Sequence, residues 1–400
     1  MKKLLTLTMT ILLTSSAVWS QTDADSAKTD AYTFSVVKEN PITSVKNQGN
    51  SGTCWSFSGA GFLESELIRM GKGVHDLSEM YIVRRNYEDK ALKYVRLSGS
   101  LNFGEGGSFA DVIETINDYG VLPDTLMNGY TYGETSHKHA EMSNVLTAYI
   151  KAVTENKNKR LSTAWYNGFK GILDAYLGII PQSFVYQGRN YTPQSLAQSL
   201  GLNSDNYVSV TSFTHHPFYS QFPIEVPDNW RWANSYNVPM DEMIQIIDNA
   251  IEKGYTVAWA SDVSEKGFTR NGLAVIPDED APENIGSDQA HWLGLSATDK
   301  LAAIRKKIES GPVKEIKVTQ EKRQAAFDNY ETTDDHGMQI YGIAKDQNGT
   351  KYYLVKNSWG ETGMYKGIWY VSETFVKYKT ISFVVNKESI PKDIAKKLSL

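Results

Sequence analysis

The chain contains a single cysteine, Cys54, among its 400 residues. A lone thiol can form no disulfide within its own chain, and it excludes metal sites built from several cysteines. The fold must therefore be stabilised by core packing, and 41% hydrophobic residues supply a sufficient core. Without a structural partner, Cys54 is either a small core residue or a reactive group.

Long apolar runs and an excess of positive charge are also missing. After the N-terminal segment, no stretch approaches the 18 uninterrupted apolar residues that predict a membrane-spanning helix. The net charge of −5 favours neither nucleic acid nor an anionic membrane as partner. The chain has no internal repeat and no low-complexity tract. A soluble, globular mature protein is therefore expected.

The N-terminus has the pattern of a secretory signal. Lys2 and Lys3 precede an apolar stretch at 4–13, and a small-residue cleavage site follows at 18–20. We predict a signal peptide over 1–20 and a secreted or periplasmic mature chain; a retained N-terminal anchor is the alternative. Cleavage removes the two lysines and moves the net charge from −5 to −7.

Hydrophobic periodicity predicts an α+β protein with a helical half early and a strand-rich half late. A mainly helical insertion is expected at 128–250, between an N-terminal half at 21–127 and a β-rich half with the C-terminal tail at 251–400. Helices are predicted at 55–70, 109–119, 143–153, 162–176, 193–200 and 240–252. Strands are predicted at 32–37, 256–260, 338–344, 351–356, 367–372 and 380–386.

The surroundings of Cys54 favour the reactive alternative. The segment 47–59 reads N-Q-G-N-S-G-T-C-W-S-F-S-G, and a predicted helix starts at the cysteine. The N-terminus of a helix stabilises negative charge and so favours the thiolate, which is the nucleophilic form. Gln48 carries an amide NH₂ group that can complement a backbone N–H in an oxyanion hole.

His336 is the best candidate base among seven histidines. It starts a predicted strand, and Asn357 follows the next strand in the motif Asn-Ser-Trp-Gly. Two adjacent strands can bring His336 and Asn357 together, so that Asn357 orients the imidazole and Trp359 covers their hydrogen bond. Asp334 and Asp335 form an acidic pair that is either merely solvated or attracts a cationic group near the site.

The other histidines have weaker claims. His291 is the rival base, but no Asn-Ser-Trp-Gly motif follows it at strand-pair spacing. The pairs His137/His139 and His215/His216 lack nearby carboxylates in the sequence, which favours solvated loops over metal binding. We therefore predict neither a metal site nor a cofactor.

These three separated motifs resemble the papain-like cysteine peptidases in their Cys–His–Asn order. The resemblance implies that Cys54 is the nucleophile, His336 the acid–base partner and Asn357 its orienting residue. It also implies that Gln48 donates to the oxyanion, with substrate-binding positions at Gly106, Gly107 and Trp359.

Two departures are similar to the bleomycin hydrolase and aminopeptidase C branch. Ser51 stands where secreted papains carry a second cysteine, and His336 lies 282 residues after Cys54 instead of the 130–150 of papains. Further stretches resemble this branch at 106–109, 119–123, 241–254, 332–336 and 383–398. The resemblance implies a helical insertion and a homo-oligomer, such as a hexamer.

The same resemblance bears on specificity. In this branch a C-terminal arm enters the cleft and favours aminopeptidase action, whereas this chain stops at Leu400. The expectation is therefore a peptidase that cleaves peptides through a thioester, as an aminopeptidase or an endopeptidase. The alternatives are a non-catalytic peptide-binding protein on the same fold and a related thiol hydrolase, such as a cell-wall amidase or transglutaminase. Gln48 and the Asn-Ser-Trp-Gly motif argue against the last of these.

Overall fold

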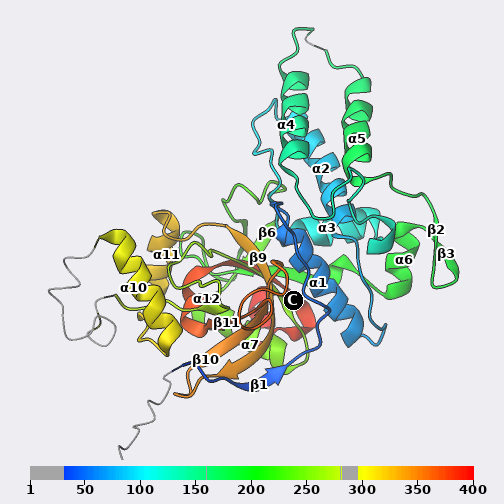
Figure 1. Cartoon of the computed structure of the whole chain (residues 1–400). Helices are drawn as coiled ribbons and strands as arrows, with labels where there is room; N and C mark the ends of the chain where they lie inside the picture. The colour runs from blue at the N-terminus through cyan, green and yellow to red at the C-terminus, as the bar shows by residue number, and fades with distance from the viewer. Residues whose placement is uncertain (1–30, 159, 280, 282–295) are drawn as a thin grey trace, which may run out of the picture.

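The computed structural model describes residues 31–158, 160–279, 281 and 296–400. Helices α1 to α6 gather on one side of the molecule, and a large sheet with its own helices forms the other (Figure 1). The expected α+β class is therefore confirmed. The predicted signal peptide at 1–20 and the rival base His291 lie outside the described residues.

The first helix, α1 (Cys54–Arg69), is the centre of the molecule. Thirteen of its 16 residues are buried, because α2 (Glu79–Arg96) and α3 (Phe109–Tyr119) pack on one side and strand β9 (His336–Lys345) on the other. Its small residues permit this enclosure: a Cβ at Gly59 would lie 2.6 Å from Val112 Cγ2 of α3. The first residue of α1 is thereby held against the sheet.

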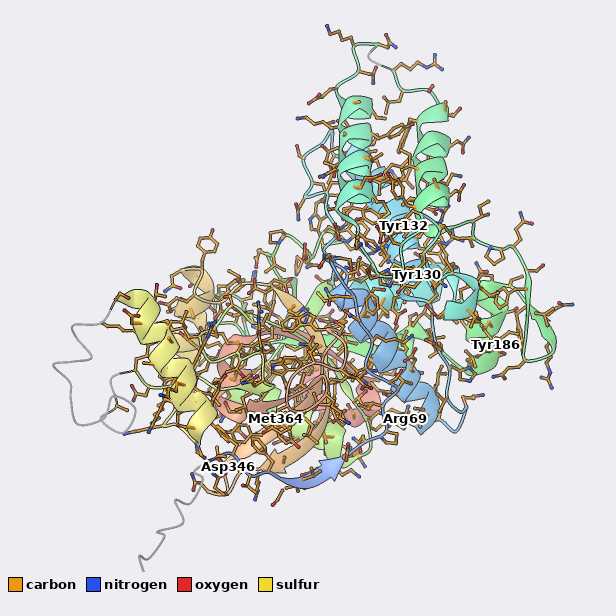
Figure 2. The ribbon with its side chains drawn as sticks, viewed as in Figure 1. Arg69, Tyr130, Tyr132, Tyr186, Asp346 and Met364 are labelled. Atoms are coloured by element: carbon orange, nitrogen blue, oxygen red, sulfur yellow. The ribbon has the colours of Figure 1, made fainter. Side chains whose placement is uncertain are left out.

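Helices α4 (Ala140–Thr154) and α5 (Ala164–Leu177) form a hairpin that projects from the helical side (Figure 1). Each buries residues spaced four apart, which makes one apolar stripe per helix: Met142, Leu146 and Ile150 in α4, and Phe169, Leu173 and Leu177 in α5. Tyr130 and Tyr132 lie at the base of this hairpin (Figure 2). Helix α6 (Pro193–Leu200) follows, after the small hairpin of β2 (Phe184–Tyr186) and β3 (Arg189–Tyr191).

A ten-stranded sheet carries the second half, in the order β5-β6-β4-β12-β7-β9-β10-β11-β8, with β1 (Ser35–Glu39) also paired to β9. The remaining strands are β4 (Tyr207–Thr211), β5 (Gln221–Pro223), β6 (Asn234–Asn237), β7 (Val257–Ser261), β8 (Leu273–Ala274), β10 (Lys351–Lys356), β11 (Ile368–Ser372) and β12 (Thr380–Asn386). Strands β7, β9, β10 and β11 are antiparallel neighbours, and this arrangement places the ends of β9 and β10 side by side.

The region 128–250 is less helical than the sequence suggests. After α6 the chain contributes β4, β5 and β6 to the large sheet before the next α-helix begins at Met240. The reason is pairing across the fold: β4 lies antiparallel to β12, with Val210 opposite Phe383. The insertion is therefore a helical unit up to about α6, followed by an extension of the sheet.

Among the described residues, five further helices cover the sheet side: α7 (Met240–Glu252), α10 (Ala297–Ser310), α11 (Gln320–Asp328), α12 (Glu373–Lys379) and α13 (Lys392–Leu398). Helix α7 has the strongest amphipathic pattern and buries Met243, Ile246, Ile247 and Ala250 against the sheet. Within the described part of the chain, no helix is both long and apolar enough to cross a membrane.

Candidate active site

Cys54 is the first residue of α1, and a hydrogen-bonded loop leads into it. Ser51 Oγ donates to the Gln48 carbonyl at 2.7 Å and lies 2.6 Å from Thr53 Oγ1, so Ser51 closes the loop at the position of the missing second cysteine. Gly49 has φ 56°, and a Cβ there would lie 2.6 Å from the His137 carbonyl oxygen. The loop therefore presents the thiol at a helix N-terminus, as the sequence predicts.

His336 and Asn357 lie side by side. His336 begins β9, Asn357 follows the last residue of β10, and the imidazole Nε2 is 2.7 Å from Asn357 Oδ1. Asn357 Oδ1 also accepts from the Ser358 N–H at 2.7 Å, which fixes the amide orientation. Trp359 covers the pair, with its ring centroid 4.8 Å from that of His336. With Nε2 held by Asn357, Nδ1 is the imidazole nitrogen that is left to exchange a proton.

The cysteine and the histidine meet where α1 touches β9. The N–H of Gly337 points to Cys54 Sγ at 3.4 Å, and Ser58 Oγ donates to the Gly337 carbonyl at 2.6 Å. A Cβ at Gly337 would lie 3.2 Å from Trp55 Cα, so this close approach of helix and strand suits glycine. Cys54 and His336 line the same cavity.

Gln48 is held by the Asn-Ser-Trp-Gly segment. Its Oε1 accepts from Ser358 Oγ at 2.6 Å, and its backbone N–H donates to the Ser358 carbonyl at 2.8 Å. Its Nε2 donates one hydrogen to the Ser51 carbonyl at 2.7 Å, and an amide NH₂ has a second. The Cys54 N–H lies in the first turn of α1, where no helical carbonyl can accept from it. Two donors of the kind an oxyanion hole needs thus come from the same loop.

Burial sets the charge state of the pair. It raises the pKa of the Cys54 thiol to about 12 and lowers the pKa of His336 to about 4, so each group resists carrying charge alone. The N–H groups of Gly337 and Trp55 lower the pKa of Cys54 in opposition to burial. Moving the thiol proton to His336 creates two opposite charges in one cavity, which stabilise each other in a low-dielectric site. We therefore expect the two groups to ionise together.

The cavity beside Cys54 has an apolar wall and an acidic one. Trp55, Phe109, Ile224, Val226, Ala260 and Ile381 supply apolar side chains, and Asp228, Asp334 and Asp335 supply carboxyl groups. Gly107 lines the cavity. Gly106 packs behind it, where a Cβ would lie 2.2 Å from Asp228 Oδ2. Trp359 covers His336 and is not among the residues that line the cavity.

The loop around His137 and His139 is not solvated, and the sequence-based expectation is wrong there. The two side chains are 5% and 1% exposed, and burial lowers the pKa of each to about 4. Backbone pairing causes this burial: the Asn50 N–H donates to the His137 carbonyl, and the His139 N–H donates to the Asn50 carbonyl. Both rings therefore pack, uncharged, behind the cysteine loop.

The expectation of no carboxylate near His215 and His216 is also wrong. Glu225 lies 3.1 Å and 3.2 Å from their Nε2 atoms, and the three groups could surround a cation. Hydrogen bonds satisfy the cluster without one. Gln324 Oε1 accepts from the Thr214 N–H at 2.5 Å, so Gln324 Nε2 faces His215 Nδ1 at 3.0 Å and donates to it. The Nε2 of His215 then carries the proton that Glu225 accepts.

Sequence reasoning did not find two contributors to this site. Ser358, inside the Asn-Ser-Trp-Gly motif, orients Gln48, and its position beside Asn357 is the signal that could have found it. Asp228 reaches the cavity from the segment between β5 and β6. No local pattern marks that segment, because its place follows from the pairing of β6 with β4.

Comparison with known proteins agrees with this geometry. The model of the papain family cysteine proteases matches residues 29–196, and the model of the peptidase C1-like family matches residues 310–400. Aminopeptidase G of Lactobacillus delbrueckii subsp. lactis is 23% identical, over 90% of this chain and 85% of its own. Aminopeptidase C of the same organism is 23% identical, over 91% and 83%.

The chain belongs to the papain-like cysteine peptidases, in the aminopeptidase C family. The fold of this peptidase also resembles that of PepW from Lactobacillus rhamnosis HN001, with a TM-score of 0.67, 18% identity, and coverage of 91% of this chain and 84% of that one. The expected family, fold and enzyme class are therefore confirmed. The roles of the individual site residues stay predictions.

Proposed function

We propose that this peptidase hydrolyses peptide bonds with Cys54 as nucleophile and His336 as acid and base. The observation that carries the proposal is the arrangement of three groups. Cys54 starts α1, His336 lines the same cavity, and Asn357 Oδ1 lies 2.7 Å from His336 Nε2. A nucleophile, a base and a group that orients the base are the elements of covalent thiol catalysis.

The reaction runs in two halves. Cys54 Sγ attacks the peptide carbonyl carbon and its proton passes to His336, while Gln48 Nε2–H and the Cys54 N–H hold the oxyanion. The C–N bond then breaks, the amine leaves with the proton from His336, and a thioester remains on Cys54. Water attacks the thioester, gives one proton to His336, and releases the acid; the proton returns to Cys54 Sγ.

This site could act as an aminopeptidase or as an endopeptidase. The names of the relatives favour aminopeptidase action. The test compares matched peptides with free and acetylated N-termini, with and without prior treatment by iodoacetamide. Loss of cleavage on acetylation would establish an aminopeptidase, and equal cleavage an endopeptidase. Hydrolysis that survives stoichiometric alkylation of the single cysteine would contradict the proposal, and binding of peptides without hydrolysis would favour the non-catalytic alternative.

The oxyanion role of Gln48 has its own prediction. We expect Gln48→Ala to lower kcat roughly 10²–10³-fold, because one donor to the developing negative charge is removed. KM should change little, since the donor acts mainly in the transition state. Steady-state kinetics on one peptide measure both values. Gln198→Ala, at an exposed position of α6, serves as a matched control that loses the same side-chain amide. A Gln48→Ala enzyme with unaltered kcat would refute the assignment.

We also propose that this peptidase is exported and that it forms a homo-oligomer. Residues 1–20 support export through their lysine pair, apolar stretch and cleavage pattern. N-terminal sequencing of the protein recovered from its host would reveal cleavage, and an intact Met1 would exclude it. The oligomer rests on the resemblance to the branch, and sedimentation velocity tests it.

A further inference from the structure

The acidic wall of the cavity has no matching cation. Asp334 and Asp228 are partly buried, and Asp335 is exposed at the rim. Apart from His336, no described residue that lines the cavity is basic. Burial raises the pKa of Asp228, and the charge of Lys90 opposes this rise. The ammonium group of Lys90, however, donates to the carbonyls of Gly104 at 3.0 Å and Gly106 at 2.5 Å.

Asp334 is the central member of this wall. Among the described residues, no hydrogen-bond donor and no cation is paired with its carboxyl group, whereas Asp335 accepts from Thr333 Oγ1 at 2.7 Å. Burial, with the neighbouring Asp228 and Asp335, raises the pKa of Asp334 to about 7. A partly buried carboxyl group without a partner is costly to the protein, and a bound cation would relieve that cost.

The apolar side chains that line the same cavity fit an aliphatic chain. Trp55, Phe109 and Ile381 offer apolar surface in the same cavity that holds Cys54. A lysine side chain combines an apolar stem with a terminal ammonium group, and it commonly lays the stem along apolar surface while the charge meets a polar group. The N-terminal amine of a peptide carries the same charge without the stem.

We propose that Asp334, assisted by Asp228, binds an alkylammonium group of the peptide substrate and so determines specificity. The inference rests on the proposed peptidase function of Cys54, and it adds the class of substrate: peptides that place a primary ammonium group beside the scissile bond. The ammonium group belongs either to a lysine side chain or to the peptide N-terminus, and both sources share one chemistry.

Four substrates separate these sources. They are aminocoumarin amides of lysine or norleucine, each with a free or an acetylated N-terminus, so that either ammonium group lies beside the scissile bond. Norleucine keeps the aliphatic stem of lysine and removes the charge. A preference for lysine among the acetylated pair identifies the side chain, and a preference for the free norleucine peptide over its acetylated form identifies the N-terminus. Hydrolysis of any of the four by the wild type, blocked by iodoacetamide, tests the proposed function separately.

The deciding measurement is the ratio of kcat/KM for the charged and neutral peptides. We expect Asp334→Asn to lower this ratio about 10-fold or more, because the attraction to the ammonium group is lost while the size of the side chain is kept. Asp228→Asn should lower it less. Asp205→Asn makes the same chemical change at an exposed residue that does not line the cavity, and it should leave the ratio unaltered.

Because a ratio is measured on one enzyme preparation, partial loss of folded protein cancels from it. A wild-type enzyme that treats charged and neutral peptides alike would overturn the proposal. A preference that persists in both Asp334→Asn and Asp228→Asn would overturn it as well. Neither result would affect the peptidase assignment, which depends on iodoacetamide-sensitive hydrolysis alone.

Discussion

Replacing Cys54 with alanine is expected to lower kcat for peptide hydrolysis by a factor on the order of 10⁴ or more, because no other group can form the thioester. The rest of the oxyanion loop should stay in place, since its hydrogen bonds involve Gln48, Ser51 and Ser358 and not the thiol. Peptide binding should therefore persist in the variant. Single-turnover kinetics and a binding titration on the same peptide measure the two effects separately.

The single cysteine makes the control unambiguous. Wild-type protein should take up one iodoacetamide adduct by mass spectrometry, and the alanine variant none. Ser100→Ala, at an exposed position beyond α2, should behave as wild type in both assays. If Cys54→Ala kept more than about a tenth of the wild-type rate, a different nucleophile or an activated water would have to replace the thiol mechanism.

Local sequence patterns predicted much of this fold because local periodicity and tertiary environment agree. Every helix and strand that the sequence predicts is present, with ends displaced by at most three residues. Helix α7 illustrates the reason: its apolar residues recur at helical spacing, and the same residues are buried against the sheet. Within the site, Cys54, Gln48, His336 and Asn357 are recognisable because each lies in or beside a motif whose chemistry needs that residue type.

The features that were missed depend on contacts between distant segments. Helix α2 buries Asn86, Glu88 and Lys90, so its core-facing residues do not look apolar. The segments of β4 to β6 become strands because they pair with β12 and with one another. His139 is polar in sequence and 1% exposed in the fold, because the cysteine loop covers it. No single-sequence pattern carries this information.

A buried acid, Asp111, joins two segments that line the cavity. It is the third residue of α3, and Oδ2 accepts from the Ser108 N–H at 2.7 Å and from Trp230 Nε1 at 3.0 Å. Its Oδ1 accepts from Arg231 Nε at 2.7 Å. Ser108 lies on the wall beside Gly107, and Trp230 follows Asp228 closely in the chain. Asp111 therefore ties the glycine segment of the cavity to the segment that carries Asp228.

Asp111→Ala is expected to lower the free energy of unfolding by about 3–5 kcal/mol, because Arg231 and two N–H donors lose their buried acceptor. Asp111→Asn should cost less, since one acceptor oxygen remains. Glu114→Ala, on the exposed face of the same helix, should change stability by no more than about 0.5 kcal/mol. Urea denaturation at constant pH measures all three, and a loss in Asp111→Ala no larger than in Glu114→Ala would show that the network does not hold the cavity walls. If it does hold them, Asp111→Asn should also weaken the preference for charged peptides, because Asp228 and Trp230 share one segment.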